Sequence, residues 1–340
     1  TSGAKRVLAP ILFFSYAVLV RIVMLNLVLL IVIHMFETSA EEHPDLSAAL
    51  RSFPLRVTEA FVAKMQIGDW EDPLLLQILP QQAEIDVTPG YSDDPLDEAS
   101  ANPIPGLIHK YHGRVLLITS PACAVHCRYC FRRNFPYNDN RPSLADWQQA
   151  IDYIASHPEI SEVILSGGDP LSLPDDYLAS LRDRLAAINH VTTLRLHTRM
   201  PLVLPARITE TLLDSLEHPR LHTVMVIHSN HANELDTHSE AALLALKHQG
   251  VTLLNQSVLL RGINDNADAL SALSRRLFAC GVLPYYLHVL DKVNGASHFE
   301  RSDEEAVALA EAMLARLPGY LVPKLVREEP GALSKRPLAL

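Results

Sequence analysis

Short apolar runs and helix-like stretches alternate along the chain from Arg114 onward. The apolar runs, each suited to one buried strand, lie near residues 115–119, 162–165, 191–196, 222–227, 251–257 and 284–289. Helix-like stretches separate or follow them near residues 143–157, 175–188, 207–217, 235–249, 266–280 and 302–316. Such short connections favour parallel strands with right-handed crossovers. Six units are too few for a closed eightfold barrel, so we predict an α/β fold built on a partial (β/α)6 barrel.

Residue types that carry chemistry gather where the predicted strands end. They are the cysteines after the first strand, Ser166–Asp169 after the second, His228 after the fourth, Asn255–Ser257 at the fifth and Asp291 after the sixth. Parallel sheets of this kind carry their sites at the carboxyl ends of the strands. We therefore expect these residues to surround one opening.

The chain before this region has a different composition. Residues 45–50, 58–68 and 74–79 predict short helices, and the segment 84–106, rich in proline and acids, predicts a turn-rich connector. We expect four segments: an apolar N-terminal segment of open status (1–43), a helical and turn-rich region (44–106), the partial barrel (107–318) and a C-terminal segment (319–340).

Residues 7–36 form a long apolar run that meets the length and hydropathy of a membrane span. Arg21 would lie near the middle of such a span, where a charge is costly. Three interpretations stay open: a membrane span, a buried helix or a stretch of unreliable sequence. We weakly favour the second and third, and expect no other span.

Charge and cysteine content narrow the class of protein. The formal net charge of −10 argues against general nucleic-acid binding, which needs a basic surface. Three of the four cysteines lie in one short stretch, so no disulfide framework can form, which fits the reducing cytoplasm.

That stretch has the spacing C-x3-C-x2-C, with Cys123, Cys127 and Cys130 directly after the first predicted strand. Ordinary cubane clusters use four cysteines, one for each iron. Three thiolates therefore predict a [4Fe–4S] cluster with one iron open to a ligand that is not protein. The alternatives are a zinc site or buried thiols, but zinc prefers four ligands, and His126 inside the loop is poorly placed as the fourth.

The cysteine stretch resembles that of the radical S-adenosylmethionine (SAM) enzymes. In that superfamily SAM binds the open iron, and the resemblance implies two further sets of SAM contacts. Ser166, Gly167, Gly168 and Asp169 resemble the Gly-Gly-acid element that holds the methionyl ammonium, and Tyr129 would lie beside the adenine.

Four later segments resemble the lysine 2,3-aminomutase family. They are Val203–Thr209, Asn255–Asp265, Pro284–Tyr286 and Gly319–Pro323, and the likeness runs from about residue 84 to the C-terminus. It is greatest to the short branch of the family, which modifies elongation factor P through β-lysine. Members use a [4Fe–4S] cluster, SAM and pyridoxal 5′-phosphate (PLP) to move an α-amino group to the β-carbon.

The resemblance assigns the PLP site by position. Lys335, in a Lys-x-Pro context, matches the lysine that binds PLP covalently, although Arg336 replaces the family's Thr. Lys110 stands where the family has an Arg on the PLP phosphate, and Gln256 matches a second phosphate contact. Tyr111 and Tyr285 match aromatic residues around the PLP ring.

The resemblance also assigns the substrate site. Arg132 matches the residue that pairs with the substrate carboxylate, for which a planar guanidinium is suited. Asp291 and Glu328 match two carboxylates around the lysine ε-ammonium, with Glu328 replacing an Asp. Two acids facing one ammonium favour lysine and disfavour acidic substrates.

We therefore expect a cytoplasmic enzyme that converts free L-lysine into β-lysine, linked to elongation factor P and its lysyl-ligase. An electron donor such as flavodoxin or ferredoxin would reduce the cluster. The alternatives are an aminomutase for glutamate or arginine, or a cluster-binding adaptor without activity. Asn266 stands near the position of a zinc-binding Cys in larger members, so we expect no zinc. The stereochemistry of the product, the particular electron donor and the oligomeric state do not follow from the sequence.

Overall fold

The computed structural model describes residues 44–140 and 144–338. The chain divides into two units, residues 1–52 and 53–340. The described part of the first unit is helix α2 (Pro44–Ser52). Among the described residues, no helix combines the length and apolar character needed to cross a membrane. The apolar run at residues 7–36 lies outside the described part of the chain.

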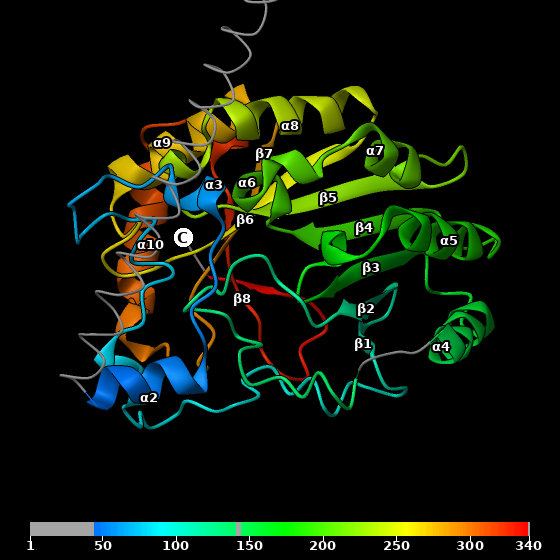
Figure 1. Ribbon diagram of the computed structural model, residues 1–340, viewed down its shortest axis with the longest axis horizontal. Helices are drawn as coiled ribbons and strands as arrows, with labels where there is room; N and C mark the ends of the chain where they lie inside the picture. Colours follow the sequence, from blue (N-terminus) through cyan, green and yellow to red (C-terminus); the bar gives the residue numbers. More distant parts are fainter. Residues whose placement is uncertain (1–43, 141–143, 339–340) are drawn as a thin grey trace, which may run out of the picture. The chain divides into compact units, whose positions relative to one another are not determined.

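A nine-stranded sheet organises the second unit, and its strands lie side by side in the order in which they occur along the chain (Figure 1). Strands β2 to β8 are parallel, whereas β1 and β9 are antiparallel at the two edges. The strands are β1 (Leu107–Tyr111), β2 (Arg114–Ser120), β3 (Glu162–Gly167), β4 (Thr193–Thr198), β5 (His222–His228), β6 (Thr252–Val258), β7 (Leu283–His288), β8 (Lys324–Arg327) and β9 (Arg336–Pro337). The sheet of the described residues is open at β1 and β9, which confirms the prediction of an α/β partial barrel.

Six helices connect or follow the parallel strands and surround the outer side of the sheet (Figure 1). They are α4 (Leu144–Ser156), α5 (Asp175–Ala186), α7 (Glu210–Leu216), α8 (Thr237–His248), α9 (Ala267–Ala279) and α10 (Asp303–Leu314). All six were predicted from the sequence. Smaller elements fill the connections: α3 (Glu59–Val62), α6 (Met200–Val203) and the 3-10 helices η1 (Gln82–Ile85), η2 (Pro170–Ser172), η3 (Pro205–Arg207), η4 (Ala232–Glu234), η5 (Ser297–Phe299) and η6 (Gly319–Leu321).

Two of the predicted N-terminal helices are wrong in type or length. Residues 74–79 form turns in place of a helix, and the helix expected over 58–68 shortens to α3. Residues 74–79 mix helical i−4 hydrogen bonds (Leu76 N to Asp72 O and Leu79 N to Leu75 O) with an i−3 bond (Ile78 N to Leu75 O), so turns form in place of a regular helix. Asp72 Oδ1 then accepts hydrogen bonds from the amides of Leu74 (2.7 Å) and Leu75 (3.0 Å), which fixes the first turn.

Alternation along each strand gives the sheet two different faces, as β4 shows. Leu194 and Leu196 are buried in the core against the outer helices. Arg195 and His197, between and after them, point to the inner side and line a cavity. Because successive side chains of a strand point to opposite faces, one strand serves both the core and a site.

Candidate active site

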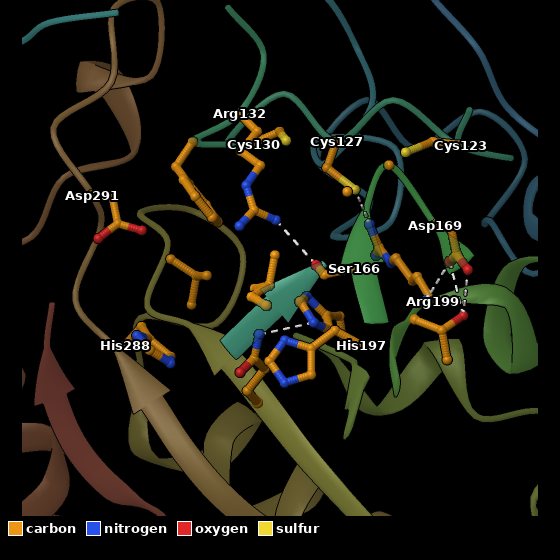
Figure 2. Close-up of a pocket in the computed structure, with 18 of the residues that line it drawn as sticks. Cys123, Cys127, Cys130, Arg132, Ser166, Asp169, His197, Arg199, His288 and Asp291 are labelled. Carbon is orange, nitrogen blue, oxygen red and sulfur yellow. Dashed lines mark hydrogen bonds between the residues drawn. The ribbon is translucent and has the colours of Figure 1, made fainter. Parts of the chain in front are cut away.

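A cavity of about 380 Å³ lies on the inner side of the sheet (Figure 2). All sixteen residues to which the sequence assigned a site role line it, whereas Asn255 and Ser257, also expected at the opening, are not among the lining residues. They are Cys123, Cys127, Cys130, Tyr129, Arg132, Lys110, Tyr111, Ser166, Gly167, Gly168, Asp169, Gln256, Tyr285, Asp291, Glu328 and Lys335. The structure thus brings them around one space, while the role of each stays a prediction.

The cysteine loop follows β2 and is held by close backbone contacts with the end of β3. The amide of Gly168 donates to Ser120 O at 2.6 Å, and the amide of Asp169 donates to Ala122 O at 2.7 Å. A Cβ atom on Gly168 would overlap the Ala122 carbonyl oxygen. Glycine is therefore required here because the two backbones approach closely, a constraint that acts whether or not a ligand is bound.

A second set of contacts fixes the other side of the cysteine loop. Arg128 is fully buried, and its Nε donates to Glu84 Oε1 at 2.8 Å. Arg133 donates to the same Glu84 carboxylate at 2.8 Å and to Gly295 O at 2.9 Å. One buried acid thus holds two arginines that bracket Cys130, so the loop is well positioned for a cofactor.

The three thiols suit an iron–sulfur cluster in chemical type and environment. Burial raises the pKa of Cys123 and raises that of Cys130 to about 11, so both are neutral until a metal displaces their protons. Among the described residues, no three His, Cys, Asp or Glu side chains are grouped so that they could hold a single metal ion. A cubane cluster does not need three side chains around one ion, because each thiolate binds a separate iron.

The carboxylate of Asp169 joins the ends of β3 and β4. It accepts hydrogen bonds from Thr198 Oγ1 (2.7 Å), the Leu171 amide (3.0 Å) and the Arg199 amide (2.8 Å). Burial raises its pKa, while these donors act in the opposite direction. In the structure Asp169 therefore fixes the Ser166–Asp169 turn, whose residues are those predicted to contact SAM.

Arg132 crosses the cavity from the cysteine loop toward Ser166 (Figure 2). Its Nε and Nη2 donate to the two oxygens of Glu98, at 2.8 and 2.7 Å, and its Nη1 donates to Ser166 Oγ at 3.0 Å. Glu98 was not predicted from the sequence, since a single acid in a turn-rich connector carries no signal. It fixes the guanidinium, which keeps further N–H groups for a ligand.

Lys335 and Glu328, which the sequence assigned to different tasks, form an ion pair. Lys335 Nζ lies 2.9 Å from Glu328 Oε2 and 3.3 Å from His288 Nε2. Lys110 Nζ approaches the other oxygen of Glu328 at 3.4 Å. Burial alone would raise the pKa of Glu328, but the ammonium groups of Lys335 and Lys110 lower it to about 2. Glu328 is therefore ionised at neutral pH.

Asp291 has the opposite electrostatic character. Burial first, and then the negative charge of Glu328, raise its pKa to about 7. In Figure 2, Asp291 and His288 lie across the cavity from Cys123 and Asp169. The cavity therefore has a thiol-rich side and a side with two carboxylates of unequal strength.

Three inward-facing histidines complete the inner surface, and the sequence had indicated only His228. Gln256 Nε2 lies 2.8 Å from His228 Nε2, and the rings of His197 and His228 are 6.0 Å apart. Burial lowers the pKa values of all three, that of His228 to about 3, so they are neutral. His197 Nε2 is buried with no hydrogen-bond partner among the described residues. The signal that could have found His197 and His288 is their alternation with the apolar residues of β4 and β7.

The donors on this surface fit a phosphate-bearing aromatic cofactor. Lys110 and Lys335 supply positive charge, and His197 has an unused ring nitrogen. Tyr111 lies under the guanidinium of Arg114, 4.4 Å from ring centre to Cζ, and Tyr285 Oη donates to Tyr286 Oη at 3.0 Å. Cations, neutral donors and aromatic rings in one cavity are the groups that a pyridine phosphate requires.

Comparison with known families identifies the class of protein. The family model for the Radical SAM superfamily matches residues 117–270. That superfamily uses a [4Fe–4S] cluster with SAM, in keeping with the cysteine loop.

Three curated relatives, each named L-lysine 2,3-aminomutase, define the family within this class. The protein of Escherichia coli is 52% identical over 86% of this chain and 85% of its own length. Those of Haemophilus influenzae and Buchnera aphidicola are 50% and 47% identical, over 85% and 83% of this chain and the same shares of their own lengths. This chain belongs to the L-lysine 2,3-aminomutase family.

Proposed function

We propose that this protein is an L-lysine 2,3-aminomutase, an isomerase that converts L-α-lysine into β-lysine. The observation that carries the proposal is that one cavity joins the cysteine loop to Lys335, Glu328 and Asp291. Relatives of the same name share about half of the sequence, which supports the same reaction. A radical formed at the cluster and an aldehyde cofactor bound to a lysine would therefore lie in the same cavity.

Cys123, Cys127 and Cys130 would hold the cluster, with the Ser166–Asp169 turn and Tyr129 around SAM. When bound, the cluster and SAM supply a radical that removes a hydrogen atom from the substrate, and PLP supplies the π-system through which the amino group moves. The protein orients these groups and excludes water from them. The buried cysteine loop and the ends of β3 and β4 perform that task.

Lys335 would bind PLP covalently, with Lys110 and Gln256 on the phosphate and Tyr111 and Tyr285 around the ring. With PLP on Lys335, Nζ would no longer be the free ammonium that faces Glu328 at 2.9 Å. The ε-ammonium of lysine would then supply the cation that this buried carboxylate needs.

Lysine would bind across the cavity with its carboxylate on Arg132 and its ε-ammonium between Asp291 and Glu328. Glu98 already fixes Arg132 in a bidentate pair, which orients its remaining N–H groups. Glutamate would place a third negative charge beside two carboxylates, so the electrostatics favour lysine.

The resemblance to the short branch of the family supports a proposal for the place of this reaction in the cell. We propose that the β-lysine serves the modification of elongation factor P by its lysyl-ligase, in the cytoplasm. A low-potential donor such as flavodoxin or ferredoxin would reduce the cluster.

The experiment is anaerobic reconstitution with iron, sulfide, SAM and PLP, followed by reduction of the cluster with dithionite, incubation with L-lysine and chromatographic detection of β-lysine. We expect β-lysine from the native protein and from Lys324→Ala, an exposed lysine of β8, but none from Lys335→Ala. Borohydride reduction followed by peptide mass spectrometry should place the cofactor on Lys335. If the protein binds the cluster but shows neither a PLP label nor product, the proposal is wrong and an adaptor function replaces it. If product forms only from glutamate or arginine, that amino acid replaces lysine as the proposed substrate.

A further inference from the structure

Arg199 joins the end of β4 to the cysteine loop. Its Nη1 lies 2.9 Å from the sulfur of Cys127, a contact that Figure 2 shows as a dashed line. The side chain is 8% exposed and lines the same cavity as the three cysteines. A buried guanidinium therefore stands directly beside one of the three predicted cluster ligands.

A buried polar network holds this guanidinium in place. Arg199 Nη2 donates to Glu234 Oε2 at 2.9 Å and to Gln77 Oε1 at 2.5 Å. Glu234 is fully buried, and its other oxygen accepts from the amide of Asn230 at 2.8 Å. Gln77 Oε1 also accepts from Asn230 Nδ2 at 3.1 Å. The orientation of Arg199 is thus fixed by parts of the chain that lie outside the cysteine loop.

The arrangement has one donor to spare. Arg199 Nε is buried and has no hydrogen-bond partner among the described residues. An arginine whose only task was to bind Glu234 would be expected to use Nε in a bidentate pair, as Arg132 does with Glu98. Arg199 instead divides its donors between the acid and the sulfur, so the contact with Cys127 is part of how this network is built.

Two physical effects of the contact act in the same direction. An N–H···S hydrogen bond withdraws charge from a thiolate that binds iron, and hydrogen bonds to sulfur are among the factors that set cluster potentials. One-electron reduction adds a negative charge to the cluster, and a nearby buried cation stabilises the reduced form more than the oxidised form. Both effects raise the reduction potential.

We propose that Arg199 is a positioning residue that raises the reduction potential of the cluster through its hydrogen bond to the Cys127 thiolate. This inference rests on the proposed role of Cys127 as a cluster ligand. It assigns to Arg199 the task of making the cluster easier for its electron donor to reduce, while Glu234 and Gln77 keep the guanidinium on the sulfur.

The experiment is a redox titration of the reconstituted full-length protein, monitored by electron paramagnetic resonance. For Arg199→Met we expect the equilibrium constant for one-electron reduction to fall at least about tenfold, which corresponds to about 59 mV. Arg199→Lys keeps the charge but not the guanidinium geometry, so its potential should lie between that of the native protein and that of Arg199→Met. The matched control is Arg276→Met on α9, which breaks an arginine–glutamate pair (2.9 Å to Glu240) outside the cavity and should leave the potential unchanged.

A double variant separates the hydrogen bond from the charge of Glu234. Arg199→Met alone leaves Glu234 as an unpaired buried acid, which itself lowers the potential. Arg199→Met with Glu234→Gln removes both charges, and a potential still below that of the native protein then reports the lost contact with sulfur. Iron and sulfide content, measured on each variant, gives a readout that does not depend on activity.

The outcomes separate the inference from the proposed function. A native protein that takes up no cluster would remove the ligand role of Cys127, and the inference with it. Variants that take up the cluster with the native potential would overturn the inference and leave the proposed function intact. If Arg199→Met takes up no cluster, the reduction potential of Arg199→Lys is the test. A potential below that of the native protein supports the inference, and a potential equal to it overturns the inference.

Discussion

At the scale of the residue, the two carboxylates of the proposed lysine site differ although both are buried. Glu328 faces two ammonium groups, which lower its pKa to about 2, whereas burial and the charge of Glu328 raise the pKa of Asp291 to about 7. Glu328 therefore provides a permanent negative charge, and Asp291 provides one that depends on pH near neutrality. The sequence shows two acids, but only their neighbours in space make them unequal.

The pH dependence of lysine binding follows from this difference. As the pH rises from about 6 to about 8, Asp291 ionises while the ε-ammonium of lysine stays charged, so the KM for lysine should fall. Asp291→Asn should raise KM about tenfold or more, the worth of a hydrogen bond between charged groups, and should abolish this pH dependence. Initial rates at several pH values, with native and variant protein, check the prediction.

A second variant tests the cause assigned to the pKa of Asp291. Because the charge of Glu328 raises that pKa, Glu328→Gln should move the change in KM to lower pH. A KM profile that is the same in the native protein and in Asp291→Asn would contradict the role of Asp291.

At the scale of the element, the cysteine loop has little regular structure of its own and depends on its neighbours. The buried Glu84 holds Arg128 and Arg133 on one side, and the glycines at the end of β3 admit the loop on the other. Neither contact is visible in the cysteine motif. The motif supplies the ligands, and these flanking elements supply their geometry.

Loss of the Glu84 carboxylate should destabilise the fold. Glu84→Ala removes the buried carboxylate that pairs with both Arg128 and Arg133, and removal of one partner of a buried pair costs about 3–5 kcal/mol. Urea unfolding of the cluster-free protein measures the change. Asp268→Ala, which breaks an exposed pair with Arg316, is the control and should change the stability little. Equal changes in the free energy of unfolding for the two variants would show that the buried pair stabilises the fold no more than the exposed pair does.

The close approach of β3 to the cysteine loop gives a separate prediction. In Gly168→Ala the new Cβ meets the Ala122 carbonyl, so the loop must shift and the thiols lose their arrangement. We expect iron content after reconstitution to fall severalfold. Gly113→Ala is the matched control, since its Cβ would lie 3.8 Å from the nearest atom. Normal iron content in Gly168→Ala would mean that the loop tolerates the displacement.

At the scale of the whole molecule, the last part of the chain completes a sheet that begins near residue 107. Strand β8 extends the parallel sheet beyond the six predicted strands, and β9 forms its final edge. These strands bring Glu328 and Lys335 into the cavity that contains the cysteine loop. The division of the chain into a barrel and a separate C-terminal segment stays a prediction, although residues 324–327 and 336–337 form strands of the same sheet.

Removal of residues 330–340 tests whether the two cofactor sites can be separated. The change deletes β9 and Lys335 but keeps β8, whose Leu325 and Val326 are buried in the core. We expect the shortened protein to take up iron normally and to show no covalent PLP label after borohydride reduction. Retention of the label would place the cofactor on another lysine, and loss of iron would show that the two sites depend on each other.

The sequence by itself determined the six strand–helix units and the three cysteines. Through family motifs it also predicted sixteen site residues, all of which line one cavity. These features follow from hydrophobic period and from short motifs, both of which are local. It did not reveal β1, β8 and β9, because these strands of two to five residues hold at most two consecutive apolar residues. Nor did it reveal the turns at residues 74–79, whose apolar pattern is typical of a helix but whose backbone mixes i−3 and i−4 hydrogen bonds.

Only the tertiary structure decided which distant residues act on one another. Glu98 on Arg132, Glu84 on Arg128 and Arg199 on Cys127 join positions far apart in the chain. So does the histidine surface, whose members come from different strands. Electrostatic and hydrogen-bond energies depend on distance and burial, which the fold sets and a linear pattern does not contain. The sequence therefore names the chemical groups of this protein, and the fold determines their charge, orientation and partners.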